Sequence, residues 1–176
     1  MLVYGLKGEL FMITLAPCEK QFRTAFENYP LSAEHLSFTR HPLELLECCE
    51  STSTYSPIVI LENSVVAGFF VLDIGEDKFH YTDIQESILL RGYSIHPAYQ
   101  GQGIAKASLD LLVTYTMEHF PQVSQIVLGV NEANKVAQSV YLTSGFMDEG
   151  RRFTGRSGTQ IAMCLQLSEI HLSRNT

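Results

Sequence analysis

The sequence predicts an α/β fold in which a mixed, mostly antiparallel central sheet carries helices on both faces. Two observations predict it. The runs 57–61 and 65–74 are rich in β-forming residues and are separated by a short polar segment, which is the pattern of an antiparallel hairpin. After Pro97 strand and helix patterns alternate, which is typical of a βαβ unit with parallel strands. Both features in one chain predict a mixed sheet.

The N-terminal elements follow from hydropathy patterns. Alternation of apolar and polar residues indicates a strand, whereas apolar residues that recur with each helical turn indicate a helix. Pro42 stands where helices often begin. The expected elements are, in order, a strand over 12–17, helices over 19–28 and 42–50, the hairpin, a polar turn-like segment over 75–83 and a β-rich strand over 86–96.

The C-terminal elements are predicted in the same way. Gly145 is a residue type typical of the position just after a helix. The expected elements are a long helix over 103–120, a short β-branched strand over 125–130, a helix over 134–144, and two closing strands over 146–152 and 159–167 joined by a turn over 154–158.

The length and composition indicate one globular domain. We treat 1–176 as a single domain, in which residues 1–11 form a loose N-terminal extension and Met12 is an alternative start. With 45% hydrophobic and 18% charged residues the chain resembles soluble proteins, and no run approaches the roughly 20 apolar residues of a membrane helix. No basic leader precedes an apolar core, so we expect no signal peptide and no membrane partner.

The cysteines and the net charge indicate the cellular location and the classes of partner that the protein can bind. The four cysteines have no regular spacing, which argues against a disulfide framework and a metal site and favours a reducing, cytoplasmic location. The net charge of −7 argues against nucleic acid as a partner, because phosphate groups bind to basic surfaces. Cationic partners such as amines suit an acidic protein better.

A glycine-bearing turn between a strand and a helix is the first candidate site. At Gly101 and Gly103 no side chain would block a ligand from the backbone, and the unpaired amides of the following helix would attract negative charge. A dinucleotide fingerprint would need a glycine where Lys106 stands, and the Gly-Lys-Ser/Thr of a P-loop is absent. From this turn alone, a phosphate site and a plain tight connection are equally supported.

Two ordered motifs resemble the GCN5-related N-acetyltransferase (GNAT) family over roughly the C-terminal half of the chain. Gln100-Gly101-Gln102-Gly103-Ile104-Ala105 matches the family signature Gln/Arg-x-x-Gly-x-Gly/Ala and follows a strand that ends in Ile95-His96-Pro97. Downstream, Val130-x-x-x-Asn134-x-x-Ala137-x-x-x-Tyr141-x-x-x-Gly145-Phe146 is similar to the second family signature. The order of elements also matches the GNAT fold.

The resemblance implies a binding site for acetyl-CoA. The main-chain amides of 100–105 would bind the CoA pyrophosphate, and Lys106 would either meet a phosphate or only decorate the helix. The preceding strand would splay from its parallel neighbour, so that main-chain groups of Tyr93 and Ile95 pair with the pantetheine arm. Gly92 is compatible with a bulge in that strand.

The same resemblance implies roles at the reacting end. The Tyr93 amide would polarise the thioester carbonyl as an oxyanion hole does. Tyr141 would protonate the departing thiolate, and Asn134 would bond the cofactor as well as, or instead of, capping its helix. Read without the family, Tyr141 would be a core tyrosine. The implied reaction is direct acetyl transfer, in a ternary complex, to a primary amine of a small molecule.

The general base is the least defined part of the site. Ile88 occupies the position where some family members carry a glutamate. Glu86 lies two residues earlier on the same strand face and is the substitute, although a solvated carboxylate at a strand end is the simpler interpretation. His80, Tyr81, Asp83 and a water chain are further alternatives.

Other interpretations stay open at this stage. Arg91 in an apolar strand would face substrate or, as we expect, extend to water. The acceptor could instead be a protein N-terminus or lysine, or the protein could bind acyl-CoA without catalysis, as the loss of glutamate at Ile88 would allow. Such folds often form a homodimer, but no segment predicts the interface.

Overall fold

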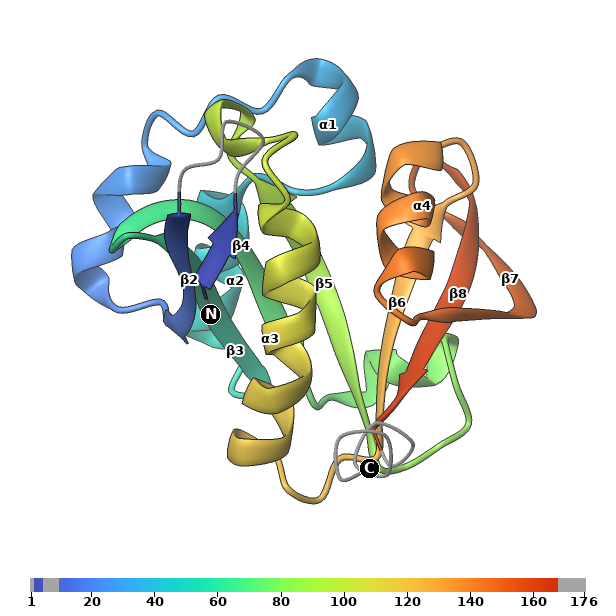
Figure 1. Cartoon of the computed structure of the whole chain (residues 1–176). Coiled ribbons are helices and arrows are strands. Elements are labelled where there is room, and N and C mark those ends of the chain that lie inside the picture. The colour runs from blue at the N-terminus through green and yellow to red at the C-terminus, as the bar shows by residue number, and fades with distance from the viewer. Residues whose placement is uncertain (1, 5–9, 168–176) are drawn as a thin grey trace.

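A computed structural model describes residues 2–4 and 10–167 of the chain. Within these residues, eight strands form one sheet in the order β1-β2-β3-β4-β5-β6-β8-β7 (Figure 1). β5 and β6 run parallel, and the other neighbouring strands run antiparallel. The predicted mixed, mostly antiparallel sheet is therefore confirmed.

The elements follow the expected order along the chain. The strands are β1 (Leu2–Tyr4), β2 (Leu10–Pro17), β3 (Tyr55–Glu62), β4 (Val65–Asp73), β5 (Ser87–Ile95), β6 (Gln125–Asn131), β7 (Met147–Gly155) and β8 (Gly158–Gln166). The α-helices are α1 (Ala33–Phe38), α2 (Pro42–Ser51), α3 (Ile104–His119) and α4 (Lys135–Thr143). The 3-10 helices are η1 (Lys20–Phe26), η2 (Glu76–His80) and η3 (Pro97–Tyr99).

Two N-terminal segments differ from the expectation. The segment 19–28 forms a 3-10 helix, η1, instead of an α-helix. α1 was not predicted, because it is short and none of its residues is buried, so it carries no apolar stripe. It begins at the N-cap Ser32, whose side chain accepts a hydrogen bond from the His35 amide.

The predicted loose extension over 1–11 is described only in part. Leu2–Tyr4 pairs as β1 with the first residues of β2, and β2 begins at Leu10, before Met12. Residues 1 and 5–9 lie outside the described part of the chain.

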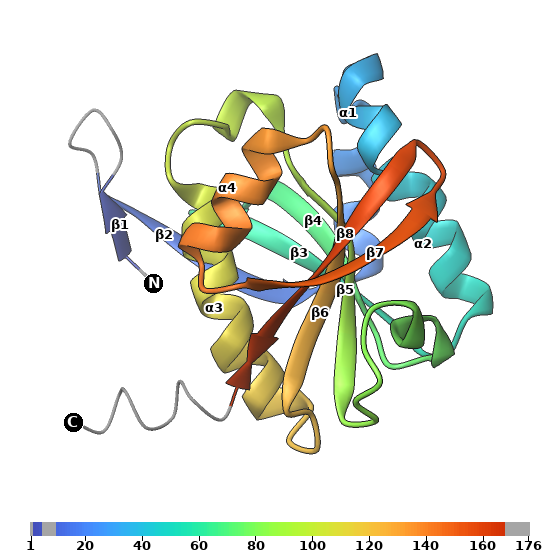
Figure 2. The ribbon, with the colours of Figure 1, turned by 90° about the vertical axis from the view of Figure 1, so that its right-hand side faces the viewer.

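Helices cover both faces of the sheet, as Figures 1 and 2 show. On one face, strand residues such as Ile88 pack in a core with Leu112 of α3 and Tyr141 of α4. On the other face, Phe69 of β4 packs in a second core with Leu45 of α2. Among the described helices, none has the length and apolar character to cross a membrane.

The parallel pair β5–β6 is joined over a short stretch. Its register runs from Ser87 opposite Gln125 to Leu89 opposite Val127. Beyond those pairs β5 and β6 diverge, and Figure 1 shows the two strands opening as a V between α3 and α4. The upper parts of both strands therefore lack each other as hydrogen-bonding partners.

A bulge in β5 lies at the start of this opening. Val71 of β4 pairs with Arg91, whereas Phe69 pairs with Ser94, so β5 contains one more residue than β4 over this stretch. Gly92 absorbs it with a left-handed φ of 64°. The predicted bulge is confirmed.

We predict that Gly92→Ala destabilises the protein by about 2–5 kcal/mol. A non-glycine residue at such a φ costs about 1–2 kcal/mol, and overpacking costs about 1–3 kcal/mol more. The added Cβ would lie 2.1 Å from Leu45 Cδ1. Denaturant unfolding measures the effect.

Gly101→Ala is the matched control for this substitution. Its φ is 73°, but a Cβ there would meet nothing within 4 Å, so we expect a loss of only about 1–2 kcal/mol. Equal losses in the two variants would show that Leu45 moves aside without cost.

Candidate functional site

The glycine-bearing turn lies between β5 and α3, as the sequence predicted, and both of its glycines are left-handed. Gly101 and Gly103 have φ values of 73° and 84°, and α3 begins directly after Gly103 without a side-chain cap. The first amide to donate into the helix is that of Ala107, which bonds the Gly103 carbonyl at 3.0 Å. The amides of Ile104, Ala105 and Lys106 therefore have no helical acceptor, and the helix dipole makes this end attractive to an anion.

Side chains of the turn fold back and hold it in place. Gln100 Nε2 donates to the Ile95 carbonyl at 3.0 Å, and Gln102 Nε2 donates to the Ala98 carbonyl at 2.9 Å. Lys106 Nζ lies 2.8 Å from Asp110 Oδ2 on the next turn of α3. These side chains thus have partners of their own, and the main-chain amides remain the groups that an anion would meet.

Main-chain groups of β5 line the opening next to the turn. The His96 amide donates to the Ala67 carbonyl on β4 at 2.8 Å. Because successive residues of a strand direct their amides to opposite edges, the amides of Ile95 and Tyr93 point away from β4, towards the V. These two amides therefore lie on the edge of β5 that faces the V, and the Ile95 carbonyl accepts a hydrogen bond from Gln100 Nε2.

The Tyr93 side chain fixes the distance between β5 and α3. Its hydroxyl lies 2.7 Å from Ser108 Oγ and donates to the Ala105 carbonyl at 3.0 Å. Its ring stacks on Phe70 with centroids 6.1 Å apart. Sequence reasoning assigned a role only to the Tyr93 amide and did not foresee this bond across the site.

Tyr141 approaches the opening from α4. Its ring lies 6.2 Å from the Tyr93 ring and 5.7 Å from that of Phe146, centroid to centroid. Burial raises the pKa of the Tyr141 phenol above its ordinary value. This phenol is therefore neutral at ordinary pH, and its ring packs edge-on against that of Tyr93.

Two asparagines organise the end of β6. Asn134 caps α4, since its Oδ1 accepts from the Ala137 amide at 3.1 Å. Asn131 accepts from the Ala133 amide through Oδ1 and donates through Nδ2 to the Ser157 carbonyl, each bond being 2.7–2.8 Å long. Sequence reasoning named Asn134 alone.

The β7–β8 turn connects this end of β6 to α1. Arg156 Nη2 donates to the Leu36 carbonyl at 2.7 Å, and Ser157 Oγ donates to the Ser37 carbonyl. These partners are about 120 residues apart in the sequence. The turn therefore bridges the two halves of the molecule.

The prediction that Arg91 extends to water is wrong. Its side chain is about one-fifth exposed, and Nη2 lies 2.7 Å from Asp73 Oδ2 and 2.8 Å from Asp77 Oδ2. It also donates to the Tyr55 hydroxyl at 2.6 Å. An arginine within an apolar strand was the available signal, but the partners come from other elements and could not be named.

Glu86 is separated from the other site residues. It is exposed and precedes β5, at the closed end of the V. Seven residues of extended strand, about 23 Å, lie between it and Tyr93. Ile88 is fully buried in the core. The structure therefore does not bring a carboxylate of this strand end to the amide of Tyr93.

The alternative residues on the preceding loop have other surroundings. Asp83 pairs with Arg151 at 2.9 Å. Tyr81 packs edge-on against Phe153 at 5.0 Å and covers Gly129 of β6, where an added Cβ would lie 2.6 Å from its ring. Neither arrangement marks a general base.

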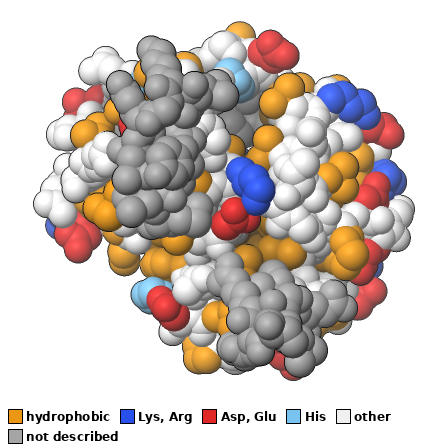
Figure 3. Space-filling view, in the orientation of Figure 1, with side chains coloured by type: hydrophobic (Ala, Val, Ile, Leu, Met, Phe, Trp, Pro, Cys, Tyr) orange, Lys and Arg blue, Asp and Glu red, His pale blue; other side chains and the backbone are white. Residues whose placement is uncertain are grey.

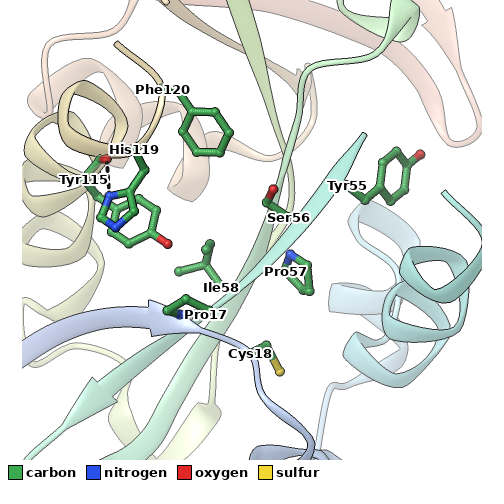
Figure 4. Close-up of a pocket in the computed structure, with 9 residues that line it drawn as sticks. All are labelled: Pro17, Cys18, Tyr55, Ser56, Pro57, Ile58, Tyr115, His119 and Phe120. Carbon is green, nitrogen blue, oxygen red and sulfur yellow. Dashed lines mark hydrogen bonds between the residues drawn. The ribbon is translucent and has the colours of Figure 1, made fainter. Parts of the chain in front are cut away.

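The surface around α3 and α4 is mixed in character. In the orientation of Figure 1, Figure 3 shows hydrophobic side chains on this face, with a basic side chain beside an acidic one near its middle. A hollow lies elsewhere, where Tyr115, His119 and Phe120 at the C-terminal end of α3 face Pro17 and Ile58 (Figure 4). Tyr115, the first α3 residue that lines it, lies about 18 Å along the helix from Gly103.

Comparisons with known proteins agree with this geometry. Residues 20–146 match the Acetyltransferase (GNAT) family. The uncharacterized N-acetyltransferase YbbJ of Bacillus subtilis (strain 168) is 30% identical over 152 residues, which cover 86% of this chain and 95% of that protein.

Solved structures share the fold. Aminoglycoside acetyltransferase AAC(6')-Ib in complex with coenzyme A and kanamycin superposes with a TM-score of 0.77 at 16% identity, over 93% of this chain and 99% of that one. Spermidine N-acetyltransferase from Vibrio cholerae in complex with CoA and spermine gives 0.67 at 20% identity, over 89% and 96%.

We predict that Tyr141 ionises only at strongly alkaline pH. Because burial raises its pKa in the folded state, the stability from the neutral phenol is complete below the ordinary value of about 10 and is lost as pH rises above it. In a titration followed by phenolate absorbance, Tyr141→Phe should remove amplitude from the late step that accompanies unfolding. Loss of amplitude near pH 10 instead would show an accessible, ordinary phenol.

Proposed function

Because the chain belongs to the GNAT family of acetyltransferases, we propose that it transfers the acetyl group of acetyl-CoA to a primary amine of a small molecule, directly in a ternary complex. One observation carries the proposal: β5 has no β6 partner beyond Leu89, and the chain runs from that open strand edge through the glycine turn into an α3 whose first amides lack helical acceptors. A phosphate group suits the amides of α3 and an extended amide-bearing arm suits the open edge of β5.

The binding roles follow from that arrangement. Main-chain amides of 101–106 would hold the pyrophosphate, since that of Gln100 donates to the Pro97 carbonyl at 3.3 Å, and Gly101 and Gly103 leave the space above them open. Main-chain groups of Tyr93 and Ile95 would bond the pantetheine arm, which would take the place of a neighbouring strand. Asn134 keeps its Nδ2 for the cofactor while its Oδ1 caps α4.

The catalytic roles concern one acyl oxygen and one sulfur. Acetyl-CoA supplies an acetyl group activated as a thioester. The Tyr93 amide would stabilise the negative charge that develops on the acyl oxygen. Tyr141 would donate its phenolic proton to the departing sulfur, a transfer that is uphill in the ground state because a thiol is the stronger acid. The amine must lose a proton to attack, and we assign that proton to water rather than to Glu86.

The acceptor class rests on charge and on the structural neighbours. A net charge of −7 favours a cationic acceptor, and the neighbours named above were crystallised with kanamycin and with spermine. Both ligands are small molecules that carry several amino groups. The four cysteines are unpaired, which suits the cytoplasm.

Calorimetry with acetyl-CoA tests the cofactor site. We expect micromolar binding by the wild-type protein and none by Gly103→Trp, because the indole would fill the space that the pyrophosphate needs. Gly150→Trp is the control, since Gly150 of β7 also has a positive φ and open space around it. An unbound wild type would end the proposal, and equal loss in both variants would show general destabilisation.

Turnover then identifies the acceptor. Thiol release across a library of small amines and a panel of peptides should favour the small amines. Release with peptides alone would reassign the enzyme to proteins, and binding without any release would indicate a non-catalytic acyl-CoA-binding module.

We predict that Tyr141→Phe lowers kcat by about a hundredfold, the usual contribution of a general acid. Affinity for acetyl-CoA should change little, because the phosphate contacts lie at α3. Steady-state kinetics and calorimetry measure the two effects. An unchanged kcat would remove Tyr141 from the mechanism.

A further inference from the structure

Arg91 occupies an unusual place for a charged residue. It follows the apolar run Ile88–Leu90 of β5, and its partner Asp73 is almost fully buried. Its Nε is buried without a hydrogen-bond partner among the described residues. Burying such a pair is costly because both ions lose their hydration, and apolar residues of similar size often serve stability equally well. Stability alone is therefore a weak explanation for this arginine.

The contacts of Arg91 form a ladder across three strands. Tyr55 of β3 pairs with Asp73 of β4, and Val71, two residues before Asp73, pairs with Arg91 of β5. The three polar side chains thus lie on one face of the sheet, in diagonal contact. The guanidinium also lies 4.8 Å from the centre of the Tyr55 ring.

A fourth element contributes the second carboxylate. Asp77 of η2 approaches the same Nη2 atom at 2.8 Å, while Asp73 is itself held by the Gly75 amide at 2.8 Å and by the Thr54 hydroxyl at 2.9 Å. The fork of Arg91 is therefore fixed from β3, β4 and η2 at once, which a flexible lysine could not reproduce.

This ladder lies directly before the bulge. The extra residue of β5 is contained between Arg91 and Ser94. On the far side, the Tyr29 hydroxyl donates to the Ser94 carbonyl at 3.3 Å, and the His96 amide donates to Ala67. The bulge is thus held on both sides along β5, by Arg91 before it and by Ser94 and His96 after it.

We propose that Arg91 is a positioning residue that locks the β5 bulge and so directs the Tyr93 amide into the opening. The inference rests on the proposed function, because it assigns the Tyr93 amide a part in acetyl transfer. Without the lower anchor the extra residue can move along β5. A shift of one position exchanges the edges to which successive amides point, and the Tyr93 amide would then turn towards β4.

Selective labelling tests this position without relying on activity. The chain has eight tyrosines, so ¹⁵N-tyrosine labelling gives few amide resonances, and that of Tyr93 is the one absent from Tyr93→Phe. We expect acetyl-CoA to shift this resonance strongly in the wild type. In Arg91→Lys the shift should be much smaller, while affinity for acetyl-CoA falls no more than about tenfold, the effect of one lost hydrogen bond.

Kinetics supply the second measurement. Arg91→Lys should lower kcat about ten- to hundredfold, because small displacements of a catalytic group are costly, with little change in KM for the amine. Asp77→Asn and Tyr55→Phe should give the same pattern more weakly, and they keep the test valid if the arginine variants fold poorly. Arg151→Lys is the matched control, an arginine paired with an aspartate at 2.9 Å on the exposed strand β7.

The outcomes separate the two proposals. If the wild type binds acetyl-CoA and Arg91→Lys retains both the Tyr93 shift and kcat, the positioning role is wrong and the proposed function stands. If Arg151→Lys shows the same losses as Arg91→Lys, the effect is not specific and the inference also fails. If the wild type does not bind acetyl-CoA, both proposals fail together.

Discussion

The early end of the β5–β6 pairing is the constraint on which the rest of the structure depends. Two parallel strands that stayed paired would satisfy each other's main-chain groups, and nothing would remain for a ligand. Here the pairing ends at Leu89 and Val127, and the residues of β5 and β6 that follow this pair are not bonded to each other. Tyr141 from α4 fills part of the gap with an aromatic ring, which holds the halves at a fixed separation.

Tyr93 connects the two ends of the candidate site. Its amide lies on the open edge of β5, and its hydroxyl bonds the first turn of α3, next to the glycine turn. Tyr93 would therefore fix the positions of the phosphate-binding amides and of the acyl group relative to each other. This arrangement agrees with the general requirement that a catalytic group be supported by packing and by hydrogen bonds of its own.

Much of the fold and the glycine turn before α3 could be predicted from sequence, for local reasons. The left-handed glycines at 101 and 103, the helix after them and the bulge at Gly92 depend on short segments with distinctive residues. What could not be predicted depends on distant partners. Arg91 contacts residues of β3, β4 and η2, and Ser157 contacts α1. The pattern of residues within one segment does not predict such long-range contacts. Glu86 precedes Tyr93 by seven residues of extended strand, and sharing a strand face with Ile88 does not shorten that distance.

The weak attachment of α1 has a consequence for how this protein can diverge. None of its residues is buried, and the β7–β8 turn holds it through main-chain carbonyls, which every residue type provides. Substitutions on α1 should therefore cost little folding energy, since surface changes usually fall within about 0.5 kcal/mol. Its side chains can therefore vary with little effect on the stability of the sheet. During evolution this helix could accumulate substitutions that change its surface chemistry, while β5 and α3 remain unchanged.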